Sequence, residues 1–400
     1  QLARQRLSTV YMPGYKVTML PDDVVQAYTL LEGRDCPAVS LYVRFDEATL
    51  AVQGQETRLE RVPIVANLRH DQLDAHLTEA WLDDPALPVG AVPEPAARVR
   101  PELSFLFRLA RQLKAQREVV RGKPENFSRP DYNFRLRRAE DGEPGGEESV
   151  EISVRRRGAP LDLIVAEAMI LANSTWGLWL AELGVPAIYR SQASLAPGVK
   201  VRMGTKSLPH AGIGVKSYAW STSPLRRYTD LVNQWQIIAG ARHGRTAALA
   251  APFKPKDAEL FSVISAFDAA YGAYNAHQAG MERYWTLKYL RQNDVRELEA
   301  TVFKEGLARA DALPLVLPVL GTADLPRGTR VRVKLGEVDL ITLDVSGTVL
   351  QRLDAPGVAP ASEEDDTEEE TVAGPIAIAV DVSDTSEDES GVPADTPSAS

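Results

Sequence analysis

Two adjacent arginines, Arg226 and Arg227, follow a sequence that is typical of the start of a helix. Ser223 and the proline after it have the residue types preferred at an N-cap and at the first helical position. We therefore expect a helix over 223–242 with both arginines in its first turn. Free N–H groups at a helix start favour anions, and guanidinium groups bind phosphate through paired hydrogen bonds. The pattern predicts a phosphate site; the alternative is that one arginine pairs with Asp230 at the surface.

Other kinds of chemistry lack the residues that they need. The five histidines are scattered without the spacing of a metal site, so we expect surface or core positions for them. The sequence Gly204-Thr205-Lys206-Ser207 lacks the earlier glycine of a phosphate-binding loop, and no Gly-x-Ser-x-Gly nucleophile motif is present. The arginine pair is therefore the most informative feature.

The stretch from Tyr218 to Leu231, which contains Thr-Ser-Pro-Leu-Arg-Arg-Tyr-Thr-Asp-Leu, closely resembles the signature of the ribonuclease II (RNB) family. Four other motifs of that family agree in order and at plausible distances, so that the resemblance covers about residues 6–290. These motifs are Tyr11-Met12-Pro13-Gly14-Tyr15 with Met19-Leu20-Pro21, then Arg129-Pro130-Asp131-Tyr132, then Glu167-Ala168-Met169-Ile170-Leu171-Ala172-Asn173, and Val185-Pro186-Ala187-Ile188-Tyr189-Arg190.

The resemblance implies a processive 3′-to-5′ exoribonuclease that uses Mg²⁺ and releases nucleoside 5′-monophosphates from single-stranded RNA. Arg226 would grip the phosphate at or beside the scissile bond and offset charge in the transition state. Tyr11 would contact the last nucleotides near the cleavage point. Arg227 and Tyr228, from the same motif, are expected to bind RNA as well.

Three further residues are implied as RNA contacts. Phe127 matches the family's base-stacking phenylalanine with a spacing difference of one residue, so Asn126 remains an alternative. Arg129 lies beside it. Glu167 would contact ribose hydroxyls or the terminal base, which favours RNA over DNA; the alternative is a helix carboxylate bonded to a neighbouring backbone group. The second aromatic of the clamp falls on a non-aromatic residue here, Gln72 or Leu73, and its place would be taken from elsewhere, for instance by Trp81.

The catalytic metal is the main departure from the family pattern. Its cluster of four aspartates lies upstream of the Tyr-Leu-Pro-Gly motif, whereas only ten residues precede Tyr11 here and none is acidic. We read Asp22-Asp23 and Asp83-Asp84 as surface or capping acids. We therefore expect the Mg²⁺ ligands to lie upstream of residue 1, with no metal site in this chain. The alternative is a catalytically inert RNA-binding adaptor that keeps the channel and the barrel.

The periodicity of the chain predicts an α+β fold that positions these motifs. Residues 1–292 would form an RNB-type domain of mixed sheet and helices, residues 299–353 a small OB-fold barrel, and residues 354–400 a disordered acidic tail. Expected strands include 38–45, 50–59 and two runs around the 142–146 turn. Expected helices span 64–84, 102–120, 162–183 and 256–292, the last as one helix or two. Barrel strands are expected at 300–303, 315–319, 330–333, 341–345 and 348–350.

The charge is divided unevenly between these parts. Of 400 residues, 55 are acidic and 45 basic, but residues 354–400 contain 14 of the acids and no Lys or Arg. The remaining body is slightly basic, so the overall charge of −10 does not exclude RNA as a partner. The apolar run over 163–180 is interrupted by polar residues and predicts a buried helix rather than a membrane span. With one cysteine and no visible signal peptide, we expect a cytoplasmic monomer.

Overall fold

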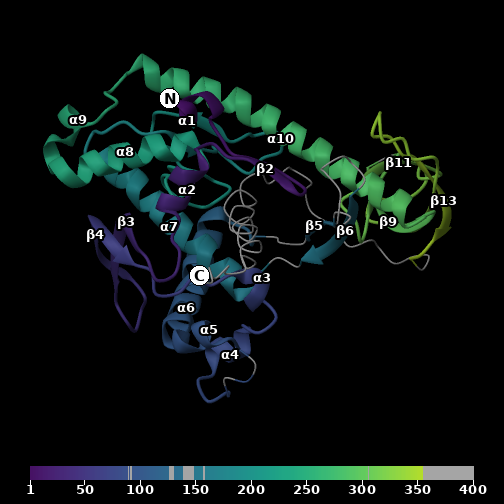
Figure 1. Ribbon diagram of the computed structural model, residues 1–400, viewed down its shortest axis with the longest axis horizontal. Helices are drawn as coiled ribbons and strands as arrows, with labels where there is room; N and C mark the ends of the chain where they lie inside the picture. The colour runs from purple at the N-terminus through teal and green to yellow at the C-terminus, as the bar shows by residue number, and fades with distance from the viewer. Residues whose placement is uncertain are drawn as a thin grey trace, which may run out of the picture.

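The structure is a computed structural model and describes residues 1–88, 90, 92–125, 130–137, 148–155, 158–304 and 306–354. Most of the chain lies at one end of a 35-residue helix, α10 (Ala258–Gln292), and a barrel lies at its other end (Figure 1). At 1.5 Å per residue, α10 is about 50 Å long. The sequence left one helix or two open over this range, and the structure has one.

Three long helices form the centre of the larger part. They are α6 (Arg100–Arg121), α7 (Pro160–Glu182) and α8 (Tyr228–His243), and α7 packs against both of the others. Among the described residues, α7 is the one helix long and apolar enough to cross a membrane by length and composition. However, it buries Asp162, Glu167 and Asn173, which bond to other elements of the protein. That pattern is typical of a core helix, as the sequence predicted.

Four antiparallel strand pairs precede the barrel in the described residues. The pairs are β1 (Val10–Met12) with β2 (Tyr15–Val17), β3 (Asp35–Phe45) with β4 (Val52–Pro63), β5 (Asp131–Arg137) with β6 (Ser149–Arg155), and β7 (Tyr189–Ser191) with β8 (Arg202–Gly204). Gly14 turns the first pair with φ of 69°, and a Cβ there would overlap Leu136 of β5. The first and third pairs therefore lie against each other.

The helix expected over 64–84 is wrong. The chain forms two short helices instead, because Thr78 accepts a hydrogen bond from the backbone N–H of Trp81 at 3.2 Å and so starts a new helix. A further short helix, over 94–98, precedes α6. The remaining helices are α1 (Leu2–Arg6), α2 (Asp22–Tyr28), α3 (His70–Leu73), α4 (Glu79–Asp83), α5 (Glu94–Arg98), α9 (Ala247–Ala250) and the 3₁₀ turn η1 (Gly244–Thr246).

The predicted barrel is present and closed, which confirms the α+β class. Its strands are β9 (Glu297–Lys304), β10 (Leu307–Ala310), β11 (Val316–Leu320), β12 (Arg330–Leu335) and β13 (Gly347–Arg352), in the order β10-β11-β13-β12-β9. The strand expected over 341–345 is wrong. Asp339 accepts hydrogen bonds from the N–H groups of Ile341 and Thr342, which makes a turn with Ile341 exposed; the missing strand is β10.

Candidate functional site

The arginine motif lies in a turn and not in the first turn of a helix. The N–H groups of Arg226 and Arg227 both donate to the carbonyl of Ser223, at 3.1 and 3.0 Å, and α8 begins only at Tyr228. Asp230, in the first turn of α8, accepts the N–H of Ser223 at 2.9 Å. This carboxylate lies near the helix N-terminus, where negative charge is favourable. The N-cap predicted at Ser223 is wrong by four residues, because the N-cap of α8 is Arg227.

The N-terminal segment runs antiparallel to this turn. The N–H of Thr9 donates to the carbonyl of Arg226, and the N–H of Tyr228 donates to the carbonyl of Leu7, both at 2.8 Å. Tyr11 follows two residues later in β1, and α1 lies beside α10 in Figure 1. The structure thus pairs the two segments that carry Tyr11 and Arg226, which are more than 200 positions apart in the sequence.

The three consecutive residues of the motif have different environments. Arg226 is half-buried, and its Nη2 atom lies 3.4 Å from the Ser223 hydroxyl. Arg227 is 3% exposed and donates to both oxygens of Asp230, at 2.8 and 2.7 Å. The ring of Tyr228 is buried edge-on against Trp235. RNA contacts by Arg227 and Tyr228 do not fit this conformation. The pairing with Asp230 is present, but it is buried rather than at the surface.

Glu167 belongs to a buried ion cluster. Arg117 from α6 donates through Nε to one Glu167 oxygen at 3.0 Å and through Nη2 to the other. The same guanidinium binds Glu125 at 2.7 and 3.1 Å and the carbonyl of Ile213 at 2.6 Å. Burial raises the pKa of Glu167 and Arg117 acts in the opposite direction. The carboxylate thus binds an arginine side chain from another helix, and not the neighbouring backbone group that the sequence offered as the alternative.

The loop before the arginine motif docks closely on α6. Gly214 has φ of 79°, and a Cβ there would overlap the carbonyl oxygen of Arg117. Together with the bond from Arg117 to Ile213, this contact connects the loop to the cluster around Glu167. The sequence could not identify Arg117, because nothing in a basic amphipathic helix marks which of its arginines is buried.

His210 begins this loop and is 1% exposed. Its Nδ1 atom accepts the N–H of Ile213 at 3.3 Å, and its ring meets Tyr218 edge-on. Burial, helped by the charge of Arg190, lowers the pKa of His210 from 6.5 to about 3. The histidine has a core position, which is one of the two positions expected from the sequence, and it is neutral at pH 7.

Acid should therefore destabilise the protein through His210. The unfolded chain takes up a proton near pH 6.5 and the folded chain does not, so stability is complete above that pH and falls progressively towards pH 3. From pH 7 to pH 5 the loss due to this residue is about 2 kcal/mol. His210→Asn keeps an acceptor for Ile213 but does not titrate. Urea unfolding at both pH values should show a smaller loss for this variant, while His243→Asn, at an exposed histidine, should behave as wild type. Equal losses in all three proteins would rule out this account.

Several predicted residues are not part of the site that the structure shows. Asn126, Phe127 and Arg129 lie outside the described residues. Leu73 and Trp81 are both 4% exposed in one hydrophobic core, and the guanidinium of Arg100 covers the Trp81 ring at 4.3 Å. Trp81 therefore cannot replace the second clamp aromatic in this conformation.

The described residues contain no group of three or more His, Cys, Asp or Glu side chains that could hold a metal ion. Asp22 lies in the first turn of α2, and Asp83 pairs with Arg111 at 2.6 Å, so these acids have the capping and surface positions expected of them. The part of the chain that the structure describes thus does not fit a Mg²⁺ site.

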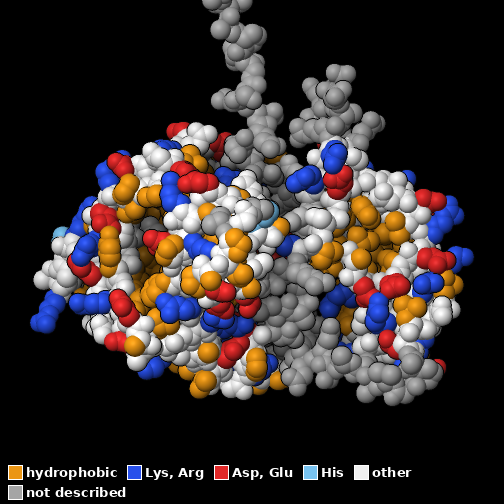
Figure 2. Space-filling view, turned by 90° about the horizontal axis from the view of Figure 1, so that it is seen from below, with side chains coloured by type: hydrophobic (Ala, Val, Ile, Leu, Met, Phe, Trp, Pro, Cys, Tyr) orange, Lys and Arg blue, Asp and Glu red, His pale blue; other side chains and the backbone are white. Residues whose placement is uncertain are grey.

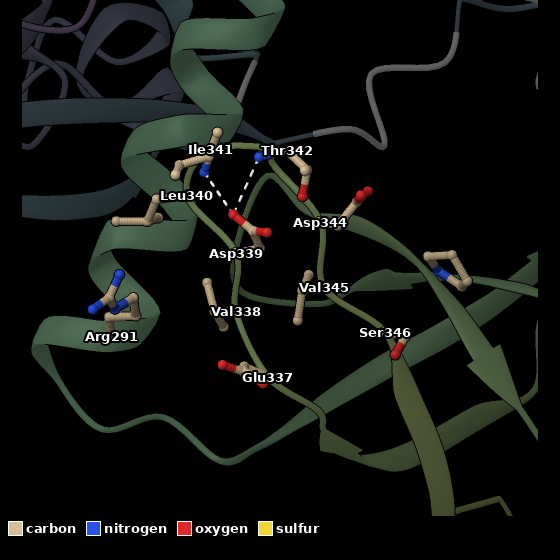
Figure 3. Close-up of a pocket in the computed structure, with 11 residues that line it drawn as sticks. Arg291, Glu337, Val338, Asp339, Leu340, Ile341, Thr342, Asp344, Val345 and Ser346 are labelled. Atoms are coloured by element: carbon tan, nitrogen blue, oxygen red, sulfur yellow. Dashed lines mark hydrogen bonds between the residues drawn. The ribbon is translucent and has the colours of Figure 1, made fainter.

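A pocket of about 660 Å³ lies at the far end of α10 from this site. It is formed by the loop over 337–346, with Arg291 of α10 at its edge (Figure 3). Its polar lining is mainly acidic, from Glu337, Asp339 and Asp344, and Asp339 is used to hold its own turn. This composition does not suit a phosphate. On the face in Figure 2, basic side chains are interspersed with acidic ones rather than gathered in one patch. The position of individual arginines is therefore more informative than net charge.

Comparison with known proteins supports the family resemblance. The model of the RNB domain matches residues 1–199 and 199–243. An uncharacterised ribonuclease of Synechocystis sp. is 27% identical over an alignment 370 residues long, which covers 84% of this chain and 50% of that protein. Exoribonuclease 2 of Vibrio parahaemolyticus is 24% identical over 60% of this chain and 41% of its own length. The chain thus spans about half the length of the curated relatives that it matches.

Solved structures show the same fold. Mycoplasma genitalium RNase R in complex with ribose-methylated single-stranded RNA has a TM-score of 0.67 at 15% identity, over 87% of this chain and 63% of that one. Yeast Ssd1, described as a pseudonuclease, has a TM-score of 0.55 at 15% identity, over 83% of this chain and 44% of that one. The fold is therefore shared by an RNA-bound ribonuclease and by a pseudonuclease.

Proposed function

Because the chain belongs to the RNB domain family, we propose that it is part of a processive 3′-to-5′ exoribonuclease that hydrolyses single-stranded RNA to nucleoside 5′-monophosphates. The observation that carries this proposal is the position of Arg226. Its side chain is half-buried, whereas Arg227 and Tyr228 are buried, and its backbone is bonded to the segment that leads into Tyr11. A guanidinium held in this way can bind a phosphate and offset charge that develops on it.

In this proposal the side chains of the chain bind and orient the RNA. Arg226 holds the phosphate at or beside the bond to be cleaved, and Tyr11 contacts the terminal nucleotides. Phe127 would stack on a base and Arg129 would contact the RNA nearby. Glu167 is held by Arg117 in the interior, so we propose no ribose contact for it. Mg²⁺ would supply the activated water, with its ligands outside the described residues.

A second function is favoured by two observations. The described residues have no metal-binding group, and one protein with this fold is a pseudonuclease. The alternative is a catalytically inert adaptor that binds RNA without cleaving it. Both functions require RNA binding, and they differ only in hydrolysis.

The test uses the intact protein with 5′-labelled single-stranded RNA and Mg²⁺. An exoribonuclease should shorten the RNA from its 3′ end and release nucleoside 5′-monophosphates, and a chelator should stop the reaction. The same RNA with a phosphorothioate at the last linkage is the matched control for cleavage at that bond. RNA binding without products would favour the adaptor, and failure to bind RNA would contradict both functions.

A further inference from the structure

The side chain of Arg227 is held in the protein interior by Asp230 and Trp220. Its guanidinium forms two hydrogen bonds with Asp230, at 2.8 and 2.7 Å, and the side chains of this pair are 4% and 0% exposed. The same guanidinium lies 3.9 Å from the ring centre of Trp220. Hydrogen bonds and stacking both restrain it, which leaves its side chain fixed in the interior.

Trp220 is clamped from both sides. Arg190 lies 3.8 Å from the centre of its ring and Arg227 3.9 Å. Two guanidinium groups cannot occupy the same face of a ring at this distance, so the indole lies between them. Tyr271 of α10 meets the ring edge-on, and the side-chain N–H of Asn233 of α8 donates to the Trp220 carbonyl at 2.8 Å. The platform under Arg227 is therefore fixed to two long helices.

The Asp230 carboxylate also defines the turn that carries Arg226. One of its oxygens accepts both the N–H of Ser223, at the start of the turn, and Nη2 of Arg227, at its end. The carbonyl of Ser223 in turn accepts the N–H groups of Arg226 and Arg227. One buried carboxylate thus joins both ends of the turn, and Arg226 is the one residue of the arginine pair whose side chain is not buried.

From this arrangement we propose that Arg227, Asp230 and Trp220 form a positioning unit that orients Arg226 towards RNA phosphate, and that Arg227 makes no phosphate contact itself. The inference rests on the proposed function of Arg226. It assigns different roles to two arginines that the sequence alone does not distinguish. Arg226 binds the anion, and Arg227 fixes the backbone from which the side chain of Arg226 extends.

The test measures binding of fluorescein-labelled single-stranded oligoadenylate to the full chain, without metal, at several salt concentrations. Arg226→Ala should weaken binding about tenfold and reduce the slope of log affinity against log salt by about 0.7, the value for one phosphate contact on a single strand. Arg227→Lys keeps the charge but not the paired hydrogen bonds. Arg227→Met/Asp230→Asn removes both charges and keeps the volume, so it avoids a buried unpaired ion.

Both Arg227 variants should bind about as weakly as Arg226→Ala, and adding Arg226→Ala to either should weaken binding no further. If Arg227 contacts phosphate itself, the effects will add. The double variant Arg226→Ala/Arg227→Lys will then retain a contribution to the salt slope that the triple variant Arg226→Ala/Arg227→Met/Asp230→Asn lacks. Either additive losses or unchanged affinity in the Arg227 variants would overturn the inference.

Amide hydrogen exchange separates this inference from the proposed function, because it needs no RNA. In the Arg227 variants the amides of Ser223 and Thr9 should exchange faster, since their acceptors belong to the turn and its Asp230 anchor. The amide of Ile237, deeper in α8, should keep its protection. Faster exchange without any effect of Arg226→Ala on RNA would contradict the proposed function alone. Unchanged exchange at Ser223 and Thr9 would contradict the positioning unit.

Discussion

Arg226→Ala is expected to lower kcat for hydrolysis of single-stranded RNA by about 10²–10³-fold, the usual effect of removing one group that stabilises transition-state charge. The guanidinium would contribute more to the transition state than to the bound RNA, because negative charge on the phosphate oxygens increases as the bond breaks. KM should change less than kcat, and single-turnover rates with saturating enzyme should show the loss directly.

Arg242→Ala is the matched control for this variant. Arg242 lies in the last turn of α8, is exposed and has the same charge, so its removal changes the net charge of the chain equally. Its rate should stay close to that of wild type. Arg226→Lys should recover only part of the rate, because an ammonium cannot bind two phosphate oxygens in the fork geometry of a guanidinium. If the alanine variants of Arg226 and Arg242 have similar rates, Arg226 does not bind the reacting phosphate.

The sequence predicted elements well where one periodicity continued over a long range. The helices α6, α7 and α10 agree with their predicted ranges to within a few residues, because their apolar residues recur at helical spacing. The barrel was also predicted, since its strands alternate between buried and exposed residues, as in β12. The errors lie where one side chain decides the local structure. Thr78 starts a new helix, and Asp339 stabilises a turn where the sequence predicted a strand.

The candidate site shows the same limit at the level of single residues. The motifs around Tyr11 and Arg226 were recognised from the sequence. However, local patterns show neither that these two segments pair antiparallel nor that Asp230 binds the N–H of Ser223. Ser223 and Pro224 are typical of a helix start, yet the helix begins later because a buried carboxylate holds the turn. Burial depends on contacts between segments far apart in sequence. For this reason the sequence could not distinguish the half-buried Arg226 from the buried Arg227.

The largest effect on stability is expected at Arg117. Arg117→Met removes the cation between Glu125 and Glu167 and leaves two buried carboxylates without it. Breaking a buried ion pair by removing one partner costs about 3–5 kcal/mol. Ile213 also loses a donor to its carbonyl, which loosens the loop that leads to the arginine motif. Chemical denaturation at pH 7 should show the loss as a lower free energy of unfolding.

The pH dependence of this loss identifies its cause. Without Arg117, burial and the charge of Glu125 raise the pKa of Glu167, and only Lys114 acts in the opposite direction. The folded state therefore binds a proton more readily than the unfolded state does. A group with a raised folded pKa favours folding at low pH, and this contribution disappears as the pH rises. The deficit of Arg117→Met relative to wild type should therefore be smaller at pH 5 than at pH 8. Adding Glu167→Gln should remove part of the deficit at pH 8, because one buried charge is gone.

Arg111→Met, on the same helix, is the control. It shows whether the loss of stability comes from leaving buried charges unpaired or simply from removing an arginine. Arg111 pairs with Asp83 at 2.6 Å, but both side chains are well exposed, at 44% and 39%. Exposed pairs contribute about 0–1 kcal/mol, and water screens the partner that remains. The variant should be almost as stable as wild type at every pH. If Arg117→Met were no less stable than Arg111→Met, or if its deficit did not depend on pH, Arg117 would not be what neutralises these two carboxylates in the folded protein.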